Sequence, residues 1–182
     1  MIIGSGLLAR AFPEYEDSKD VIIFASGVSD PEEGNGEEFD REEDLLIMTM
    51  GEHPEKKLVY FGTTSSRNTP YVHHKYEMEN LVQEHPSWLL FKLGPVYSDN
   101  PMGYTFYDVT YNKILNDQVV ELWAGQSRPI IHISDVQIYV RTCLLMNLKN
   151  VTTSLIGRYK TVEEIVEMIE KQLNKKAKVR YV

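Results

Sequence analysis

A repeated alternation of apolar runs and helical patterns constrains the fold of this chain most strongly. Residues 20–27 form a continuous apolar run that ends in small residues, which is typical of a strand buried on both faces. Further strand patterns follow at 57–61 and 87–93, and apolar residues at helical spacing lie between them, over about 39–50 and 71–83. The alternation predicts a mostly parallel, doubly wound α/β sheet.

The ends of the chain contain shorter patterns. A minimal strand opens it, followed by a glycine turn and a helix that ends near Tyr15. Beyond residue 98 we expect a helix over about 105–115, strands over 119–123 and 129–133, a helix over 135–146 and a final helix. Thr161 opens that final helix, and Glu164 three positions later matches a capping box.

Charge and length exclude several classes of protein. The net charge of −8 argues against a nucleic-acid partner, since phosphates require a basic surface and the one basic stretch, 171–180, is typical of a solvated helix end. No window approaches 18 apolar residues, and the chain opens without a basic region or a cleavage site, so we expect a cytosolic protein with no membrane partner. The 182 residues suit one compact domain.

Cys143 is the only cysteine. A single thiol excludes an intrachain disulfide and any multi-thiolate metal site, and no metal is expected. The neighbouring Leu144 and Leu145 favour a buried helix residue over a nucleophile.

The first turn of the chain carries the spacing G-x-G-x-x-A at Gly4, Gly6 and Ala9. Such a turn lets the backbone approach a pyrophosphate at the positive end of a helix, while a small third residue lets helix and strand come close. The pattern alone is equally compatible with a simple strand-to-helix turn.

Tyr71 and Lys75 are spaced as Y-x-x-x-K, shortly after the polar run 62–66. Residues four apart share a helix face, so an ammonium there would lie beside a phenol and favour its ionised form. A hydroxyl from the preceding strand end would then hold a substrate oxygen against Tyr71. Alone, the pair is equally compatible with an ordinary exposed helix face.

Further motifs follow in a characteristic order. Residues 24–27 read Phe-Ala-Ser-Gly at a strand end, residues 93–97 read Leu-Gly-Pro-Val-Tyr, and residues 128–136 are similar to an R-x-h-I-H-V-x-D-V signature. With the glycine turn and Y-x-x-x-K, this order resembles the extended short-chain dehydrogenases/reductases, the family of nucleotide-sugar epimerases, dehydratases and reductases. The resemblance spans nearly the whole chain and implies one Rossmann-like domain over 1–182, to which about 98–182 contributes a small substrate lobe.

The resemblance also implies roles for the residues around Tyr71. Tyr71 would be the acid/base, and Lys75 would lower the pKa of Tyr71 and hold the nicotinamide ribose. Counting from the strand end favours Thr64 as the catalytic hydroxyl, with Thr63 and Ser65 as close competitors that would bind substrate. His73 and His74 have no role in the family pattern, and one of them is expected to face solvent.

The resemblance implies NAD or NADP as the cofactor and a sugar nucleotide as the substrate. The residues that would bind the cofactor are Gly4, Ser5, Gly6, Leu7, Ala25, Ser26, Gly27, Lys75, Pro95 and Val96, with Ala9 beside the pyrophosphate. Arg128 resembles the arginine that many relatives place on the phosphates of the sugar nucleotide, where a planar guanidinium suits a bidentate contact. The alternative for Arg128 is a surface arginine in a turn.

Two departures from the family pattern bear on the cofactor. Ile3 stands where the usual G-x-x-G-x-x-G turn has its first glycine, and only about five residues separate Tyr15 from Val21. A standard fold inserts two strands and a helix at that point, and the tip of the missing second strand normally supplies the residue that contacts the adenosine ribose. The adenine half of the pocket is therefore absent, or built from the acidic loop after Gly27, or supplied by a second subunit.

Three functions follow from this pattern. The first is an NAD(P)-dependent oxidoreductase or epimerase/dehydratase that acts on a nucleotide-linked sugar, with Tyr71 moving the proton. The second is a relative without dinucleotide that serves as a binding or scaffold subunit in sugar metabolism, and the third is a cofactor-free isomerase. Relatives often dimerise through the helix that carries Y-x-x-x-K, so Met78, Leu81 and Val82 are expected to serve either a homodimer interface or the core.

Overall fold

The computed structural model describes residues 1–30, 34, 36–103 and 105–182. The chain forms two compact units, the first made of Met1–Gly94 and Ser134–Leu155, the second of Pro95–Ile133 and Ile156–Val182. The range expected for the C-terminal lobe, about 98–182, is therefore divided between the two units, because residues 134–155 belong to the first.

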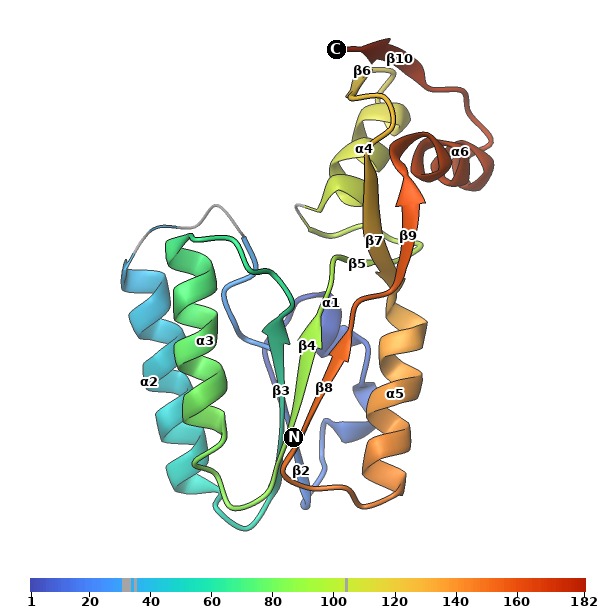
Figure 1. Ribbon diagram of the computed structural model, residues 1–182. Helices are drawn as coiled ribbons and strands as arrows, with labels where there is room; N and C mark the ends of the chain where they lie inside the picture. The colour runs from blue at the N-terminus through green and yellow to red at the C-terminus, as the bar shows by residue number, and fades with distance from the viewer. Residues whose placement is uncertain (31–33, 35, 104) are drawn as a thin grey trace. The chain divides into compact units, whose positions relative to one another are not determined.

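A five-stranded parallel sheet forms the centre of the first unit (Figure 1). Its order is β1 (Ile2–Ile3), β2 (Val21–Phe24), β3 (Lys57–Thr63), β4 (Trp88–Leu93) and β8 (Val151–Leu155). Every neighbouring pair in this sheet is parallel. The predicted parallel α/β sheet is thus confirmed.

Helices cover both faces of this sheet. α2 (Gly36–Glu52) and α3 (Pro70–Val82) lie on one face, whereas α1 (Leu7–Arg10), the 3-10 helix η1 (Pro13–Tyr15) and α5 (Ile133–Leu145) lie on the other (Figure 1). Gln137 of α5 donates to the Ala11 carbonyl, and Arg141 bonds Glu14 at 2.7 Å, which ties α5 to the α1–η1 segment.

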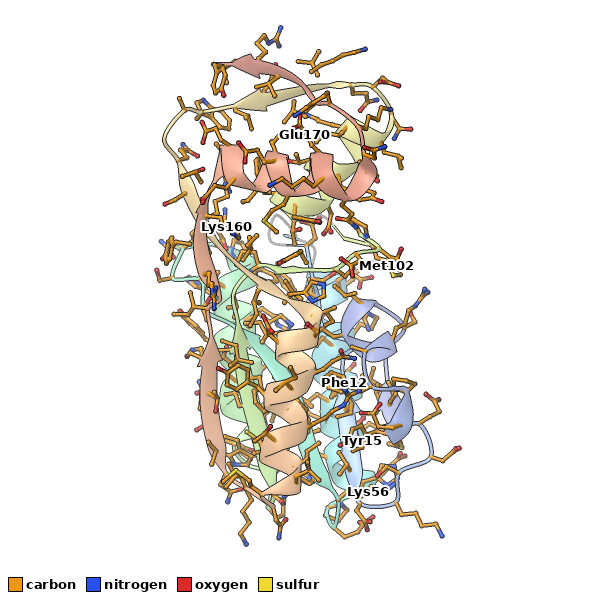
Figure 2. The ribbon with its side chains drawn as sticks, turned by 90° about the vertical axis from the view of Figure 1, so that its right-hand side faces the viewer. Phe12, Tyr15, Lys56, Met102, Lys160 and Glu170 are labelled. Atoms are coloured by element: carbon orange, nitrogen blue, oxygen red, sulfur yellow. The ribbon has the colours of Figure 1, made fainter. Side chains whose placement is uncertain are left out.

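Side chains alternate along the strands and so fill both layers. Phe24 and Tyr60 face the α2–α3 layer, where Met78 and Val82 are almost completely buried with them. Phe12 packs on the opposite face, beside α5, with its ring 6.0 Å from that of Phe61 (Figure 2). Met78 and Val82 therefore serve the core.

The second unit has its own core around two helices. Its strands are β5 (Val96–Tyr97), β6 (Val119–Leu122), β7 (Ser127–His132), β9 (Arg158–Thr161) and β10 (Lys178–Tyr181), and its helices are α4 (Phe106–Leu115) and α6 (Val162–Leu173). β7 pairs in parallel with β5 and antiparallel with β9, and β10 pairs in parallel with β6. The capping box predicted at Thr161 and Glu164 is confirmed.

The first strand lies at an uncovered edge of the main sheet. Within the part of the chain that the structure describes, β1 pairs with β2 and with no strand on its other side. η1 ends at Tyr15 and β2 begins at Val21, so the short connection predicted from the sequence is present. The strands that a standard fold inserts there are missing between them.

Two smaller predictions have different outcomes. Cys143 is half-buried in α5 rather than fully buried, and burial raises the pKa of its thiol. Among the described residues, no helix is long and apolar enough to cross a membrane.

Candidate functional site

Tyr71 lies in the first turn of α3, at the carboxyl edge of the main sheet. Thr69 caps this helix by accepting a hydrogen bond from the Val72 amide at 3.3 Å, and Pro70 occupies a first-turn position that needs no amide donor. β3 ends at Thr63, and the Thr63 hydroxyl lowers the pKa of Tyr71. The turn between β3 and α3 thus brings a buried hydroxyl against a partly exposed phenol.

The hydroxyls of Thr63 and Thr64 also form hydrogen bonds with backbone groups. The Thr64 hydroxyl donates to the Leu93 carbonyl at 3.2 Å, and the Thr63 hydroxyl accepts from the Ser65 amide at 3.1 Å. The sequence favours Thr64 as the catalytic hydroxyl, with Thr63 and Ser65 as close competitors. Of these three, only Thr63 is among the causes that shift the pKa of Tyr71, so the choice between Thr63 and Thr64 stays a prediction.

Lys75 is held by a buried carboxylate, Glu42 of α2. Its Nζ lies 2.9 Å and 3.1 Å from the two oxygens of Glu42, and 3.3 Å from the hydroxyl of Tyr60. Tyr60 donates a short hydrogen bond to Glu42, which also contacts His74 Nε2 at 3.0 Å and accepts from the Val28 amide at 2.7 Å. The Glu42 side chain is 0% exposed, and its carboxylate is bonded to Lys75, Tyr60, His74 and the Val28 amide.

These contacts keep Glu42 ionised. Burial by itself raises the pKa of a carboxyl group, but the hydrogen bond from His74, the charge of Lys75 and the hydrogen bonds from Tyr60 and Lys75 together lower the pKa of Glu42 to about 2. Burial lowers the pKa of Lys75, and Glu42 opposes that shift.

The pKa of Tyr71 is raised to about 12. Burial is the largest cause and the charge of Glu42 the second, whereas the hydrogen bond with Thr63 acts in the opposite direction. The expectation that Lys75 lowers this pKa is therefore wrong for the structure described here. The Lys75 ammonium lies 6.0 Å from the centre of the Tyr71 ring, and its charge is compensated by Glu42.

The glycine turn at the start of the chain is built as the sequence predicts. Gly4 has a φ of +123°, and a Cβ there would collide with the Ala25 carbonyl, so only glycine fits between β1 and the end of β2. Gly6 caps α1, and a Cβ on Gly6 would project into open space. Ser5 accepts a hydrogen bond from Arg10 through its carbonyl, at 2.9 Å, and Leu7 begins α1.

The segment after β2 lies against the Glu42–Lys75 pair. A Cβ on Gly27 would come within 2.5 Å of Lys75 Nζ and 2.7 Å of Glu42 Oε1, so the backbone covers the pair directly. Ser26 accepts hydrogen bonds from Arg41 of α2, at 3.3 Å to its hydroxyl and 3.2 Å to its carbonyl. Glu32 and Glu33, from the acidic loop proposed for the adenine side, lie outside the described residues.

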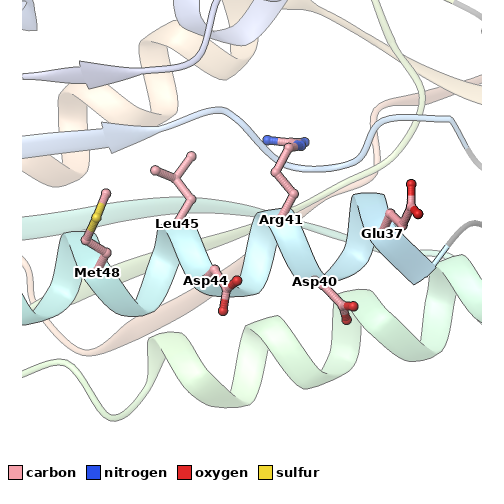
Figure 3. A pocket seen from close by; sticks show the side chains of 6 residues that line it. All are labelled: Glu37, Asp40, Arg41, Asp44, Leu45 and Met48. Carbon is pink, nitrogen blue, oxygen red and sulfur yellow. The ribbon is translucent and has the colours of Figure 1, made fainter.

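An open groove of about 570 Å³ runs along α2 (Figure 3). Figure 3 shows Arg41, Leu45 and Met48 projecting from the same side of the helix, and Asp40 and Asp44 from the other side. Glu37 completes the lining. Four of the six lining residues are charged, and the other two, Leu45 and Met48, are apolar.

The remaining predicted residues belong to the second unit. Pro95 accepts a hydrogen bond from the Ile131 amide at 3.0 Å, and Val96 pairs with Ile131. The Arg128 guanidinium lies 4.8 Å from the centre of the Phe106 ring, and its buried Nε has no hydrogen-bond partner among the described residues. Pro95, Val96 and Arg128 therefore belong to the second unit, whereas Tyr71 belongs to the first.

The sequence did not identify three buried residues of the cluster around Lys75, which are Glu42, Tyr60 and His74. Glu42, grouped there with a solvated acidic face, is buried because it shares one side of α2 with Leu46 and Thr49 at i+4 and i+7. His74 is also buried, whereas His73 faces solvent as expected for one of the two. Helical spacing to Leu46 was the signal that would have identified Glu42.

Clusters of metal ligands are not seen in this site. No group of three or more His, Cys, Asp or Glu side chains that would hold a metal ion occurs within residues 1–30, 34, 36–103 and 105–182.

No protein-family model and no curated protein matches this sequence. Solved structures do match. The chain is similar to dTDP-glucose 4,6-dehydratase from Bacillus anthracis in complex with NAD, with 18% identity and a TM-score of 0.68, over 90% of this chain and 60% of that one.

Two further structures agree. UDP-glucuronic acid 4-epimerase from Bacillus cereus, in complex with UDP-glucuronic acid and NAD, matches with 16% identity and a TM-score of 0.69, over 94% of this chain and 65% of that one. A hypothetical dTDP-4-dehydrorhamnose reductase from Sulfolobus tokodaii matches with 15% identity and a TM-score of 0.65, over 90% of this chain and 64% of that one.

These similarities confirm the Rossmann-like fold. At 15–18% identity they establish the fold alone. The chain spans 60–65% of the length of these three structures, so it has a shortened form of that fold.

Proposed function

We propose that this protein is an NAD(P)-dependent oxidoreductase or epimerase/dehydratase of the short-chain dehydrogenase/reductase type, acting on a nucleotide-linked sugar with Tyr71 as the proton-transferring residue. The observation that carries the proposal is the position of Tyr71 in the first turn of α3, shortly after β3 ends at Thr63. Ligands of open α/β sheets bind beyond the carboxyl ends of the strands, which is where both hydroxyl groups lie. The named substrates of the similar structures support the substrate class.

The two hydroxyl groups suffice for the proton part of the reaction. Tyr71, with a pKa raised to about 12, keeps its proton at neutral pH and can donate it to a substrate oxygen that gains negative charge. Thr63 would hold the same oxygen through a second hydrogen bond. A bound nicotinamide would supply the hydride chemistry, which amino-acid side chains do not provide.

The residues fit the pyrophosphate of a dinucleotide better than its nicotinamide ribose. The open space above Gly6 and the close approach of Gly4 to Ala25 suit a pyrophosphate on the first turn. Lys75 does not fit a ribose contact, because its ammonium is bonded to Glu42 and Tyr60 beneath Gly27. We therefore assign residues 4–7 and 25–27 to the cofactor and leave Lys75 out of that contact.

Arg128 is proposed to bind the phosphates of the sugar nucleotide. Its Nε is buried without a partner among the described residues, and its guanidinium stacks over Phe106. Its Nη2 donates to the side chain of Gln126 at 3.5 Å, and a planar guanidinium held in this way would present its remaining donors to a phosphate. Pro95 and Val96, from the segment that resembles the family's nicotinamide contact, are proposed to approach the cofactor, and Ser65 the substrate.

Two observations favour a second candidate, a binding or scaffold subunit without dinucleotide. The first is that Lys75 is paired with Glu42. The second is that β1 has no outer neighbour among the described residues. If this candidate holds, replacing Tyr71 with Phe and Lys75 with Ala leaves partner binding intact.

Fluorescence titration with NADH and NADPH tests the cofactor part of the proposal. We expect saturable binding of at least one nucleotide, and its loss in Gly6→Val, because the new side chain projects into the space above the turn. Gly51→Val, the same change at an exposed position with no atom near its Cβ, is the matched control. If neither nucleotide binds wild-type protein at about millimolar concentration, a weak limit for a cofactor, hydride transfer is ruled out.

A homodimer through α2 and α3 is also proposed. Ile47 and Met48 of α2 are 49% and 52% exposed, and Tyr76 of α3 is 38% exposed. These apolar side chains would be covered by a second copy. Sedimentation equilibrium of wild type and Met48→Lys distinguishes a dimer that the substitution disrupts from a monomer in both cases.

A further inference from the structure

Glu42 contacts Lys75, which lies four residues after the proposed proton donor Tyr71. The proton transfer from Tyr71 does not itself require Glu42. Glu42 comes from α2, reaches past the end of β2, and meets Lys75 and His74 of α3 and Tyr60 of β3. Its side chain is 0% exposed and that of Lys75 is 4% exposed. A carboxylate at this position is costly to bury and would not persist without its partners.

We infer that Glu42 is a positioning residue of this site: it holds the ammonium of Lys75 in the interior and compensates its charge, so that Tyr71 stays protonated and gives its proton to a carbonyl oxygen of the substrate. The inference rests on the proposed function and specifies its direction, which is reduction of a carbonyl on a nucleotide-linked sugar. An uncompensated lysine would instead favour the phenolate, the form that abstracts a proton.

The groups that face Lys75 come from every element around it. Glu42 contributes a negative charge from α2 and Tyr60 a hydroxyl from β3. Glu79 of α3 acts in the same direction as Glu42, whereas Arg41 of α2 opposes both. The backbone at Gly27 closes the remaining side.

The groups that face Tyr71 are Glu42 from α2, Glu79 from α3, Thr63 from β3 and Arg67 from the connection between β3 and α3. The two carboxylates raise the pKa of the phenol, whereas Thr63 and Arg67 lower it. Glu79 is itself paired with Lys92 at 2.9 Å. Glu42 is therefore the charged neighbour that contributes most to the protonated state of Tyr71.

The chemical balance of the step is simple. The O–H bond of Tyr71 breaks as an O–H bond forms on the former carbonyl oxygen, and the carbonyl carbon gains a hydride from a reduced nicotinamide dinucleotide. The sugar carbon is reduced and the dinucleotide is oxidised. Tyr71 then regains its proton from solvent, because its side chain is partly exposed.

The direct test follows the ionisation of Tyr71 by NMR in protein with ring-13C-labelled tyrosine, with its signal assigned from Tyr71→Phe. In Glu42→Gln we expect the midpoint of the Tyr71 titration to fall by about one pH unit or more, because the charge that raises it is gone. Glu43→Gln makes the same change at the next, exposed residue of α2 and should leave the midpoint unchanged. Glu42→Asp keeps the charge and should restore the wild-type midpoint.

A second variant keeps the test valid if Glu42→Gln does not fold. Glu42→Gln/Lys75→Met removes both charges together and leaves no single buried charge. Its Tyr71 midpoint should stay close to that of the wild type, because no uncompensated lysine is left near the phenol. A midpoint equal to the wild type in Glu42→Gln, or a midpoint in the double variant that falls by about one pH unit or more, overturns the inference.

The titration needs neither substrate nor cofactor, so it separates this inference from the proposed function. If NADH and NADPH fail to bind but the Tyr71 midpoint falls in Glu42→Gln, the function is wrong and the role of Glu42 stands. If the nucleotides bind and the midpoint does not move, the function stands and the role of Glu42 is wrong. In an active enzyme, Glu42→Gln should also move the alkaline limb of the rate of carbonyl reduction to lower pH.

Discussion

Glu42 and Lys75 depend on each other because both are buried, with 0% and 4% of their side chains exposed. At the scale of single residues, we predict that Lys75→Met lowers the free energy of unfolding by about 3–5 kcal/mol, since it leaves a buried carboxylate without its cation. Glu42→Gln/Lys75→Met should lose less than the sum of the two single variants. Urea unfolding of the four proteins measures this, and strictly additive losses would mean that the pair is not coupled.

Acid should weaken the protein through the same carboxylate. The pKa of Glu42 is lowered in the folded state from 4.5 to about 2, so its contribution is complete above about pH 4.5 and is lost as the pH falls toward 2. The contribution is about 3 kcal/mol at 1.36 kcal/mol for each pKa unit. The unfolding free energy of wild type should therefore fall more steeply than that of Glu42→Gln over this range. Parallel curves would show that Glu42 is not ionised in the folded protein.

The two threonines at the end of β3 should differ in function. The Thr63 hydroxyl lowers the pKa of Tyr71, whereas the Thr64 hydroxyl is bonded to the Leu93 carbonyl. Removing one hydrogen bond that stabilises a developing oxyanion costs about 10²–10³ in rate. Thr63→Val should show a loss of this size in kcat, and Thr64→Val should change kcat much less. The reverse order would return the catalytic role to Thr64.

At the scale of elements, the start of α3 fixes the position of Tyr71. Thr69 accepts the hydrogen bond of the Val72 amide and caps the helix. Thr69→Ala should cost about 1 kcal/mol of stability and loosen the first turn. Ser66→Ala in the exposed part of the same connection is the control. Urea unfolding of both variants checks the difference, and equal stability would show that the cap does not hold this turn.

The elements around the site were largely predictable. The expected helix over 71–83 matches α3, and the apolar runs at 20–27 and 87–93 contain β2 and β4. The run at 57–61 covers β3 except for its last two residues. Each of these strands has neighbours on both sides, and buried strands give continuous apolar runs. Periodicity and capping residues were therefore sufficient for the scaffold that carries Tyr71.

β8 was not predicted, for a physical reason. Its sequence, Val-Thr-Thr-Ser-Leu, carries no continuous apolar run, because it lies at the edge of the sheet and pairs with β4 alone. Its burial alternates along the strand until Leu155. Continuous apolar runs indicate strands that are buried on both faces, so they do not reveal an edge strand such as β8.

The site itself was predicted less completely than the fold. Tyr71, Lys75 and the hydroxyl run followed from spacing, but the partner of Lys75 is Glu42, which is 33 positions away in the sequence. Only the packing of α2 against α3 brings these two side chains together. The choice between Thr63 and Thr64 likewise depended on where β3 ends, and strand ends are the least certain feature of a sequence-based prediction.

At the scale of the whole molecule, the chain leaves the first unit after Gly94 and returns to it with α5 and β8. The sequence predicts one small lobe from about residue 98 onward, whereas residues 134–155 belong to the first unit. The shortened N-terminal half was foreseen correctly, since five residues between η1 and β2 leave no room for two strands and a helix.

The central claim is that Tyr71 transfers the proton in a hydride-transfer reaction on a nucleotide-linked sugar. Its most direct test is the rate of NADH or NADPH oxidation with nucleotide-linked keto sugars in wild type, Tyr71→Phe and Tyr139→Phe. Tyr139→Phe removes an exposed phenol of α5, on the other face of the sheet, and should keep the wild-type rate. Tyr71→Phe should lose about 10²–10⁴-fold, the usual contribution of a general acid, with its fold unchanged. A Tyr71→Phe variant that turns over at the wild-type rate would contradict the account.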